Sequence, residues 1–206
     1  MTKTKNPTPL GVGGFKTVFL DRDGVINRNP PNMGYVRRWT DFSFIPGARR
    51  AIQKLTQSGY RIFVVTNQSG IGRGLYSEED LRDIHSRMTT QIAEAGGRID
   101  AVYYCPHHPN AGCECRKPKP GMLRRAAQEH NIDLSSAYFV GDVMTDIQAG
   151  RRAGTTTCLV LTGLGRESYH NYISADYQHA DREACRPDKI FTNLYAAACW
   201  LRFFNT

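Results

Sequence analysis

Two pairs of acidic residues are candidates for metal binding. Each pair follows a short apolar run that is typical of a strand. Asp21 and Asp23 come directly after Val-Phe-Leu, and Asp142 and Asp146 follow a later apolar run. Taken alone, Asp-x-Asp-Gly is equally consistent with an exposed turn, where Asp and Gly are common. Two acidic pairs at one edge of one sheet could instead hold a hard divalent cation, which takes oxygen ligands and often substrate phosphate. The spacing therefore indicates a candidate metal site.

Residues suited to an anion accompany these carboxylates. Thr66 and the glycine-rich stretch behind it offer a hydroxyl and free backbone N–H groups to a phosphate. Lys117 lies in the Pro-rich sequence RKPKPG, just ahead of a predicted helix. Basic residues in such a loop are usually solvated, but a rigid loop could hold a fixed cation against a phosphoryl dianion. The combination is typical of phosphoryl transfer.

A second cluster of metal-binding residue types lies between the glycine-rich stretch and the basic loop. It comprises Cys105, His107, Cys113 and Cys115. Three sulfurs and one imidazole make a complete tetrahedral set for Zn²⁺, with no open position for catalysis. The spacing differs from that of ordinary zinc fingers, so a chance cluster of buried thiols is the alternative, and His108 is an alternative imidazole. We expect a structural zinc that fixes the basic loop.

The elements that must position these residues follow from apolar runs that alternate with helical patterns. We expect strands at 18–20, 62–65, 101–104, 137–140, 158–161 and 190–191. We expect helices at 47–58, 77–95, 121–131 and 147–153 and from about 193 onward. The stretch 166–186 shows no clear period. The alternation predicts an α/β fold with a doubly wound, mostly parallel sheet, in which ligands bind at the carboxyl ends of the strands.

Length and composition restrict the class of protein. The 206 residues suit a single domain at 15–206, preceded by a flexible arm at 1–14. The arm lacks the apolar core of a secretion signal, and no apolar run reaches the roughly 20 residues of a membrane helix. We therefore expect a cytoplasmic protein with no membrane partner. The formal net charge of +8 favours anionic partners without choosing among them.

The four motifs, in this order, resemble those of the haloacid dehalogenase superfamily of phosphatases, over about residues 18–154. The stretches DRDGVIN, GYV, VVTNQSGIGRG, YYCPHHP and CECRKPKPGML are similar to one branch of that superfamily. This branch includes phosphatases that act on heptose bisphosphate and on histidinol phosphate. The chain departs from the heptose enzymes at Val143, where they often carry a basic residue, and in a longer stretch between Asn27 and Gly34.

The resemblance implies a Rossmann-like fold and hydrolysis of a phosphate monoester through an aspartyl-phosphate. Asp21 is expected to be the nucleophile, and Asp23 the general acid and base. Thr66 and Lys117 would stabilise the phosphoryl group. Catalytic Mg²⁺ would be held by Asp21, the backbone carbonyl of Asp23 and Asp142.

The same resemblance assigns supporting roles to two further residues. Asp146 would position a metal-bound water or Lys117, and Arg116 would recognise substrate, including a second phosphate. Among the two histidines of the cysteine cluster, the family pattern favours His107 as the zinc ligand.

We expect no large cap domain, because the segments between motifs are too short to fold into one. Substrate recognition would then fall to three loops at 27–36, 67–74 and 105–117. Their candidate contacts are Asn27, Gly34, Tyr35, Asn67, Gln68, Ser69 and Arg116. The resemblance favours heptose 1,7-bisphosphate as the substrate, cleaved at C7 during synthesis of the heptose precursor of lipopolysaccharide.

Two alternatives accompany this expectation. Histidinol phosphate is the alternative substrate. A basic protein that binds nucleic acid or processes 3′-phosphates is the alternative class, and it is disfavoured because the basic residues are spread out and no aromatic platform is evident. The protein is expected to be a monomer.

Overall fold

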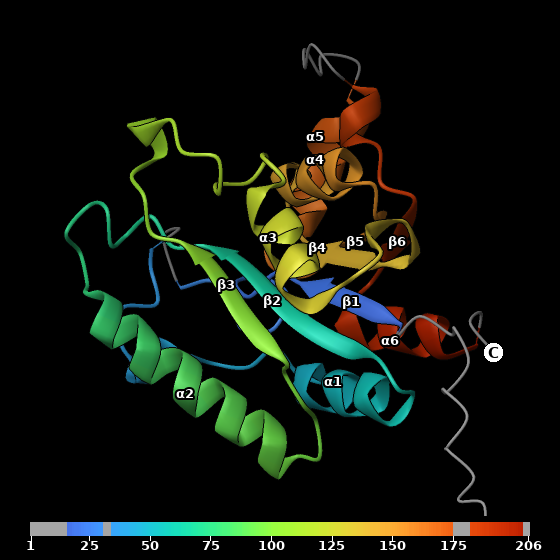
Figure 1. The fold of residues 1–206 in the computed structure, drawn as a ribbon, viewed down its shortest axis with the longest axis horizontal. Coiled ribbons are helices and arrows are strands. Elements are labelled where there is room, and N and C mark those ends of the chain that lie inside the picture. Colours follow the sequence, from blue (N-terminus) through green and yellow to red (C-terminus); the bar gives the residue numbers. More distant parts are fainter. Residues whose placement is uncertain (1–15, 31–33, 175–181, 204–206) are drawn as a thin grey trace, which may run out of the picture.

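The computed structural model describes residues 16–30, 34–174 and 182–203, so the expected arm at 1–14 lies outside the described residues. One sheet of six strands, all paired in parallel, runs in the order β3-β2-β1-β4-β5-β6 (Figure 1). The strands are β1 (Thr17–Leu20), β2 (Arg61–Asn67), β3 (Ala101–Cys105), β4 (Tyr138–Gly141), β5 (Thr156–Val160) and β6 (Lys189–Phe191). This is the α/β sheet that the alternating pattern predicts.

Helices cover both faces of the sheet. They are α1 (Ala48–Gln57), α2 (Glu78–Glu94), α3 (Gly121–His130), α4 (Met144–Ala153), α5 (Gly165–Ile173) and α6 (Leu194–Phe203). Figure 1 places α1, α2 and α6 on one side of the sheet and α3 and α4 on the other. The doubly wound arrangement is therefore confirmed.

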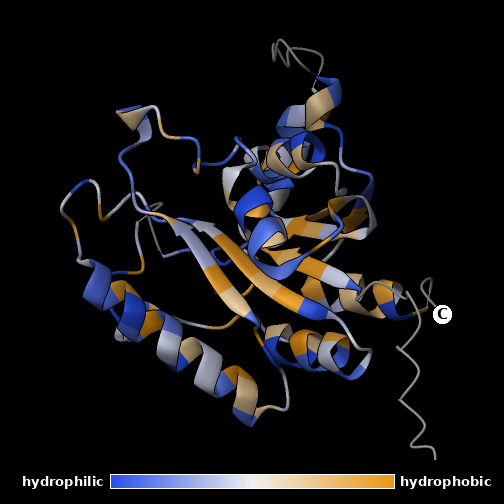
Figure 2. Cartoon of the chain, in the orientation of Figure 1, coloured by the Kyte–Doolittle hydropathy of each residue, from blue (hydrophilic) through white to orange (hydrophobic). Residues whose placement is uncertain are grey.

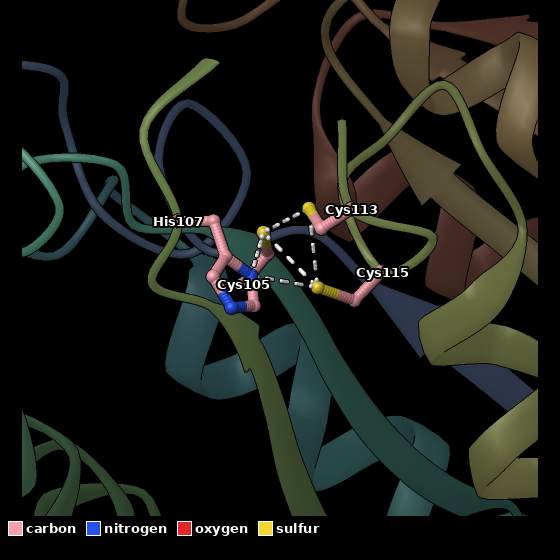
Figure 3. Close-up of side chains that lie close together, drawn as sticks. All are labelled: Cys105, His107, Cys113 and Cys115. Carbon is pink, nitrogen blue, oxygen red and sulfur yellow. Dashed lines mark hydrogen bonds between the residues drawn. The ribbon is translucent and has the colours of Figure 1, made fainter. Parts of the chain in front are cut away.

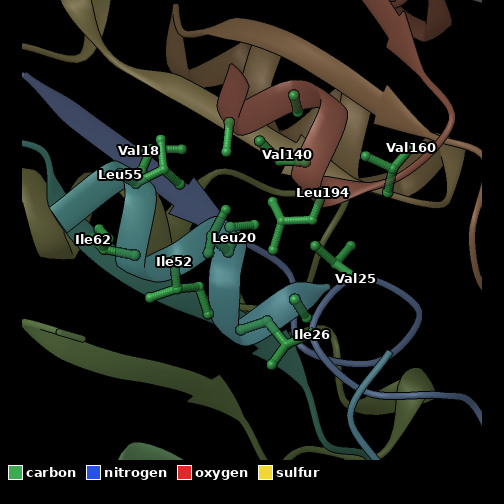
Figure 4. Close-up of a cluster of buried hydrophobic side chains, with 14 of the residues drawn as sticks. Val18, Leu20, Val25, Ile26, Ile52, Leu55, Ile62, Val140, Val160 and Leu194 are labelled. Carbon is green, nitrogen blue, oxygen red and sulfur yellow. The ribbon is translucent and has the colours of Figure 1, made fainter. Parts of the chain in front are cut away.

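Successive side chains of the central strands enter two hydrophobic cores, one on each face of the sheet. Val18 and Leu20 of β1 pack with α1 and α6, as Figure 4 shows, whereas Phe19 joins the cluster beneath α3. Successive side chains of a strand point to opposite faces, so a strand covered on both faces must be apolar throughout. The central strands accordingly appear hydrophobic in Figure 2, while the outer surfaces of the helices are largely hydrophilic.

Two elements differ from the sequence prediction. Helix α4 begins at Met144, three residues before the expected start, because the Asp146 carboxylate accepts the backbone N–H groups of Asp142 and Val143 and caps the helix. Helix α5 occupies part of the stretch 166–186, where no element was predicted. Its sequence carries no apolar stripe, since Gly165 is its only buried residue.

The connections leave no room for a large cap. In the described part of residues 28–47, the only helix is a 3-10 turn at Trp39–Asp41, and β2 and β3 are joined through α2 alone. The expectation of a fold without a large cap is confirmed for the residues that the structure describes. None of the helices in these ranges combines the length and the apolar character that crossing a membrane requires.

Candidate active site

The carboxyl ends of β1 and β4 and the start of α4 bring Asp21, Asp142 and Asp146 together around Lys117. The Lys117 Nζ lies 2.7 Å from Asp21 Oδ1 and 2.7 Å from Asp146 Oδ1, and it donates to the Val65 carbonyl at 3.0 Å. Asp21, Asp142 and Asp146 can each offer an oxygen within 4.8 Å of the others. Residues from separate strand ends thus form one compact charged cluster.

This cluster has a deficit of positive charge. Asp21, Asp142 and Asp146 are 6%, 2% and 0% exposed, yet only the Lys117 ammonium faces them among the described residues. Burial raises the pKa of Asp21 to about 7, against the pull of Lys117 and with help from the charge of Asp146. Burial and the charge of Asp21 also raise the pKa of Asp142 well above its usual range. Oxygen donors with surplus negative charge fit a divalent cation such as Mg²⁺.

Lys117 is fixed in its charged form by the same neighbours. Burial alone would lower its pKa, but the carboxylates of Asp146 and Asp21 outweigh this effect and raise the pKa above its ordinary value. Lys117 is 4% exposed, and its ammonium contacts oxygens of Asp21, Asp146 and Val65. It is therefore a permanent cation beside Asp21.

Asp23 lies in a different environment from Asp21. Arg22 Nη2 donates to both of its oxygens at 2.9 Å, and Asn27 Nδ2 and Gln68 Nε2 donate at 2.8 and 2.9 Å. Burial would raise the pKa of Asp23, but the Arg22 charge and these hydrogen bonds outweigh it and lower the pKa below its usual range. The lowered pKa keeps Asp23 ionised, and the hydrogen bonds orient it. Its side chain is 27% exposed and therefore within reach of solvent.

Sequence reasoning missed the contact that holds Arg22. This arginine is 1% exposed, and its Nη1 lies 3.1 Å from His85 Nε2 on α2. Burial and the Arg22 charge lower the pKa of His85 to about 3, so the ring is neutral and can accept the hydrogen bond. One signal was available, because His85 occupies the apolar stripe that Leu81 and Met88 define on α2.

Three of the predicted substrate contacts are hydrogen-bonded to residues that the sequence predicts to be catalytic. Asn27 is fully buried and donates to Asp23. Asn67 brackets the Lys117 backbone, accepting its N–H at 3.1 Å and donating to its carbonyl at 3.2 Å. Gln68 donates to Thr66 Oγ1 at 2.8 Å as well as to Asp23.

Of the other predicted contacts, Gly34, Tyr35 and Arg116 are exposed or half-buried, whereas Ser69 is buried. The Tyr35 hydroxyl is 3.3 Å from Ser69 Oγ, and Gly34 beside it is exposed. Arg116 is half-buried, and its Nη1 is buried without a hydrogen-bond partner among the described residues. An unpaired buried guanidinium nitrogen is costly, which favours an anionic ligand at this position.

The predicted zinc ligands form a second cluster, shown in Figure 3. Cys105 Sγ lies 3.6 Å from Cys113 Sγ and 3.3 Å from Cys115 Sγ, and His107 Nδ1 lies 3.2 Å from Cys115 Sγ. Ligand atoms on a tetrahedron with bonds of about 2.3 Å are separated by roughly 3.8 Å, so the set could close on one Zn²⁺ with small shifts. His108 instead accepts the Asn110 N–H and takes no part in the cluster.

The ionisation of one thiol also suits a metal. Burial would raise the pKa of Cys113, but a backbone hydrogen bond from Arg116 and bonds with Cys115 and Cys105 lower it to about 7. Zinc binds the thiolate form, so Cys113 is the thiol that most readily becomes a ligand. Burial instead raises the pKa of Cys105 to about 12 and also raises that of Cys115, so these two thiols must lose their protons when the metal binds.

The cysteine cluster is tied to the catalytic loops by backbone contacts. Gln68 N–H donates to the Cys105 carbonyl and Gly72 N–H to the Pro106 carbonyl, both at 2.8 Å. Cys115 directly precedes Arg116 and Lys117 in the chain. A metal in this cluster would thus restrain the segment that presents both cations.

Comparison with known families agrees with this geometry. A model described as haloacid dehalogenase-like hydrolase matches residues 16–154, and one described as HAD-hydrolase-like matches residues 114–197. The chain belongs to the haloacid dehalogenase-like hydrolase family.

Particular relatives narrow the comparison to one kind of phosphatase. The chain is 42% identical over 154 residues to the D-glycero-beta-D-manno-heptose-1,7-bisphosphate 7-phosphatase of Bordetella bronchiseptica, covering 75% of this chain and 85% of the relative. It is 44% identical over 148 residues to the enzyme of the same name from Pseudomonas aeruginosa, covering 72% and 82%.

Solved structures give the same result. The D,D-heptose 1,7-bisphosphate phosphatase of B. bronchiseptica, complexed with magnesium and phosphate, matches with a TM-score of 0.81 and 36% identity, covering 90% of this chain and 97% of that chain. The corresponding phosphatase of Burkholderia thailandensis matches with a TM-score of 0.66 and 34% identity, covering 93% and 99%.

Proposed function

We propose that this chain is a Mg²⁺-dependent phosphatase that removes the C7 phosphate of D-glycero-β-D-manno-heptose 1,7-bisphosphate, in synthesis of the heptose precursor of lipopolysaccharide. One observation carries the chemistry: the buried carboxylates of Asp21, Asp142 and Asp146 lie together, and among the described residues only the Lys117 ammonium, which pairs with Asp21 and Asp146, offsets their charge. The names of the relatives supply the substrate and its β anomer. They do not favour histidinol phosphate or nucleic acid.

Asp21 and Asp23 carry the reaction in two displacements. The Asp21 carboxylate attacks phosphorus and the bond to the C7 oxygen breaks, while Asp23 gives that oxygen a proton. Water then attacks the aspartyl-phosphate, Asp23 accepts its proton, and Asp21 is released with inorganic phosphate. Arriving phosphate raises the pKa of Asp23 by its negative charge, so the proton for the first displacement is taken up with the substrate.

The remaining residues stabilise charge and fix geometry. Lys117 and Thr66 would contact the transferring phosphoryl oxygens, and the unpaired Arg116 Nη1 would contact the substrate. Mg²⁺, when bound by Asp21, the backbone carbonyl of Asp23 and Asp142, supplies positive charge that offsets repulsion between nucleophile and phosphate.

Zinc in the cysteine cluster would be structural. All four side chains of Cys105, His107, Cys113 and Cys115 would be ligands, which leaves no position for substrate. We further propose that residues 15–206 form one domain, that the protein is a cytoplasmic monomer, and that Gly34, Tyr35 and Ser69 border the bound sugar.

The experiment is incubation with the β-1,7-bisphosphate and Mg²⁺, followed by ³¹P NMR of the products. We expect inorganic phosphate and heptose 1-phosphate, with the C1 phosphate retained. Asp21→Asn should remove turnover while leaving the folded state intact, whereas Asp83→Asn, an exposed control on α2, should leave turnover unchanged. Release of the C1 phosphate, or activity above a few per cent in Asp21→Asn, would contradict the proposal.

A further inference from the structure

The turn after β5 touches the catalytic segments and belongs to none of the four motifs. Leu164 N–H donates to Asp142 Oδ2 at 2.8 Å, and the Thr162 hydroxyl donates to the Gly24 carbonyl at 2.7 Å. Gly24 directly follows Asp23, so this turn bridges the segment after β1 and the segment after β4. The turn after β5 thus contacts the segment after β1 through the Thr162 hydroxyl and the segment after β4 through the Leu164 backbone.

The bridge requires two glycines at its closest point. Gly163 has a φ of +57°, and a Cβ there would lie 2.2 Å from Asp142 Oδ2 and 2.4 Å from Gly24 Cα. Gly24 has a φ of +85°, and a Cβ there would lie 1.9 Å from Asp142 Oδ2. Any side chain at either position would displace the Asp142 carboxylate.

The contacts leave the two oxygens of Asp142 unequal. Oδ2 is packed between Gly24 and Gly163 and accepts the Leu164 N–H, while the residue is 2% exposed. No ion pair to Asp142 occurs among the described residues. Mg²⁺ demands near-ideal octahedral geometry, whereas Ca²⁺ accepts a carboxylate through both oxygens.

We propose that Thr162, Gly163 and Leu164 are positioning residues that present Asp142 to the metal through one oxygen, and so favour Mg²⁺ over Ca²⁺. The inference rests on the proposed function, because it assumes that the carboxylate cluster is the metal site. It adds a determinant of metal choice in a turn that sequence motifs do not mark.

The test is calorimetric titration of the metal-free protein with Mg²⁺ and, separately, with Ca²⁺. Thr162→Val should weaken Mg²⁺ binding by about three- to tenfold through loss of one hydrogen bond, and Thr162→Ser should restore it. Gly163→Ala should weaken Mg²⁺ binding by at least about tenfold and Ca²⁺ binding less, since Oδ2 is displaced. Thr155→Val is the matched control, at the opposite end of β5, where the hydroxyl has no hydrogen-bond partner in the part of the chain that the structure describes.

Equal Mg²⁺ affinity in wild type, Thr162→Val and Gly163→Ala, with folding verified by circular dichroism, would overturn the inference. So would equal weakening for Mg²⁺ and Ca²⁺ in Gly163→Ala. If Gly163→Ala does not fold, Thr162→Val against Thr162→Ser decides. The titration uses no substrate, so its result is independent of whether the heptose is the true substrate.

Discussion

At the scale of single residues, the two aspartates that we propose to be catalytic are two positions apart but lie in different environments. Burial and the neighbouring carboxylates raise the pKa of Asp21 despite Lys117, and so favour its neutral form until a metal ion binds. Hydrogen bonds from Arg22, Asn27 and Gln68 instead keep Asp23 ionised. Different environments for two carboxyl groups allow one to act as nucleophile and the other to move protons. The donors around Asp23 are therefore as important as the residue itself.

Replacing Asn27 tests this role. The side chain is fully buried and its amide donates to Asp23 Oδ1 at 2.8 Å, so Asn27→Ala should reduce kcat by about ten- to a hundredfold while KM changes little. Steady-state kinetics with the heptose bisphosphate measures both constants. A raised KM with unchanged kcat would show that Asn27 contacts substrate, as the sequence suggested, and not the acid-base residue.

His85 gives a prediction about pH. Its pKa is about 3 in the folded chain and about 6.5 when unfolded, so between these values only the unfolded chain binds the proton. Stability is therefore lost as pH falls below about 6.5, by about 2 kcal/mol at pH 5. Gln at this position keeps an acceptor for Arg22 but does not titrate.

The measurement is urea unfolding of metal-free wild type and His85→Gln at pH 7 and pH 5. The variant should gain about 2 kcal/mol relative to wild type on going to pH 5, because other titrating groups are common to both proteins. Equal changes in the two proteins would mean that His85 is protonated in the folded state.

At the scale of elements, strands and amphipathic helices could be predicted because their apolar patterns are complete. The four residues of β1 are all buried, and α1 buries Ala48, Ala51, Ile52 and Leu55 on one face. Helix α5 could not be predicted, since it buries only a glycine. The start of α4 was predicted too late because its first buried apolar residue is Ile147, whereas the Asp146 carboxylate caps a helix that begins at Met144.

In the site, too, some features could be predicted from local sequence patterns and others could not. Residues at strand ends could be located from the sequence, because parallel strands bring their carboxyl ends to one edge. The Arg22–His85 contact joins residues 63 positions apart, and the turn at Thr162 reaches back 138 positions to Gly24. Such contacts depend on how α2 and the β5 turn pack, which no local pattern encodes.

Loss of metal from the loop that carries Cys105, His107, Cys113 and Cys115 should disturb the active site. Cys113→Ser should remove the zinc, lower Tm by about 5–10 °C and reduce activity, because the loop carries Arg116 and Lys117. Cys199→Ser on α6 is the matched control and should change none of these. Metal analysis with calorimetry measures the effect. Full activity and unchanged Tm in a zinc-free Cys113→Ser protein would refute a structural metal.

At the scale of the whole molecule, the described residues leave the carboxyl edge of the sheet without a large cap. We therefore propose that contacts on the loops after β1, β2 and β3 select the substrate. The formal charge of +8 is consistent with a doubly phosphorylated substrate, and steering by a basic surface would raise the rate of capture.

The most direct test is therefore kcat/KM for phosphate release with Mg²⁺, compared among the β and α anomers of heptose 1,7-bisphosphate and histidinol phosphate. We expect the β anomer to be preferred over histidinol phosphate by about a hundredfold or more, which corresponds to roughly 2.7 kcal/mol of transition-state discrimination. Preference for histidinol phosphate, or no activity on either heptose anomer, would contradict the proposed function.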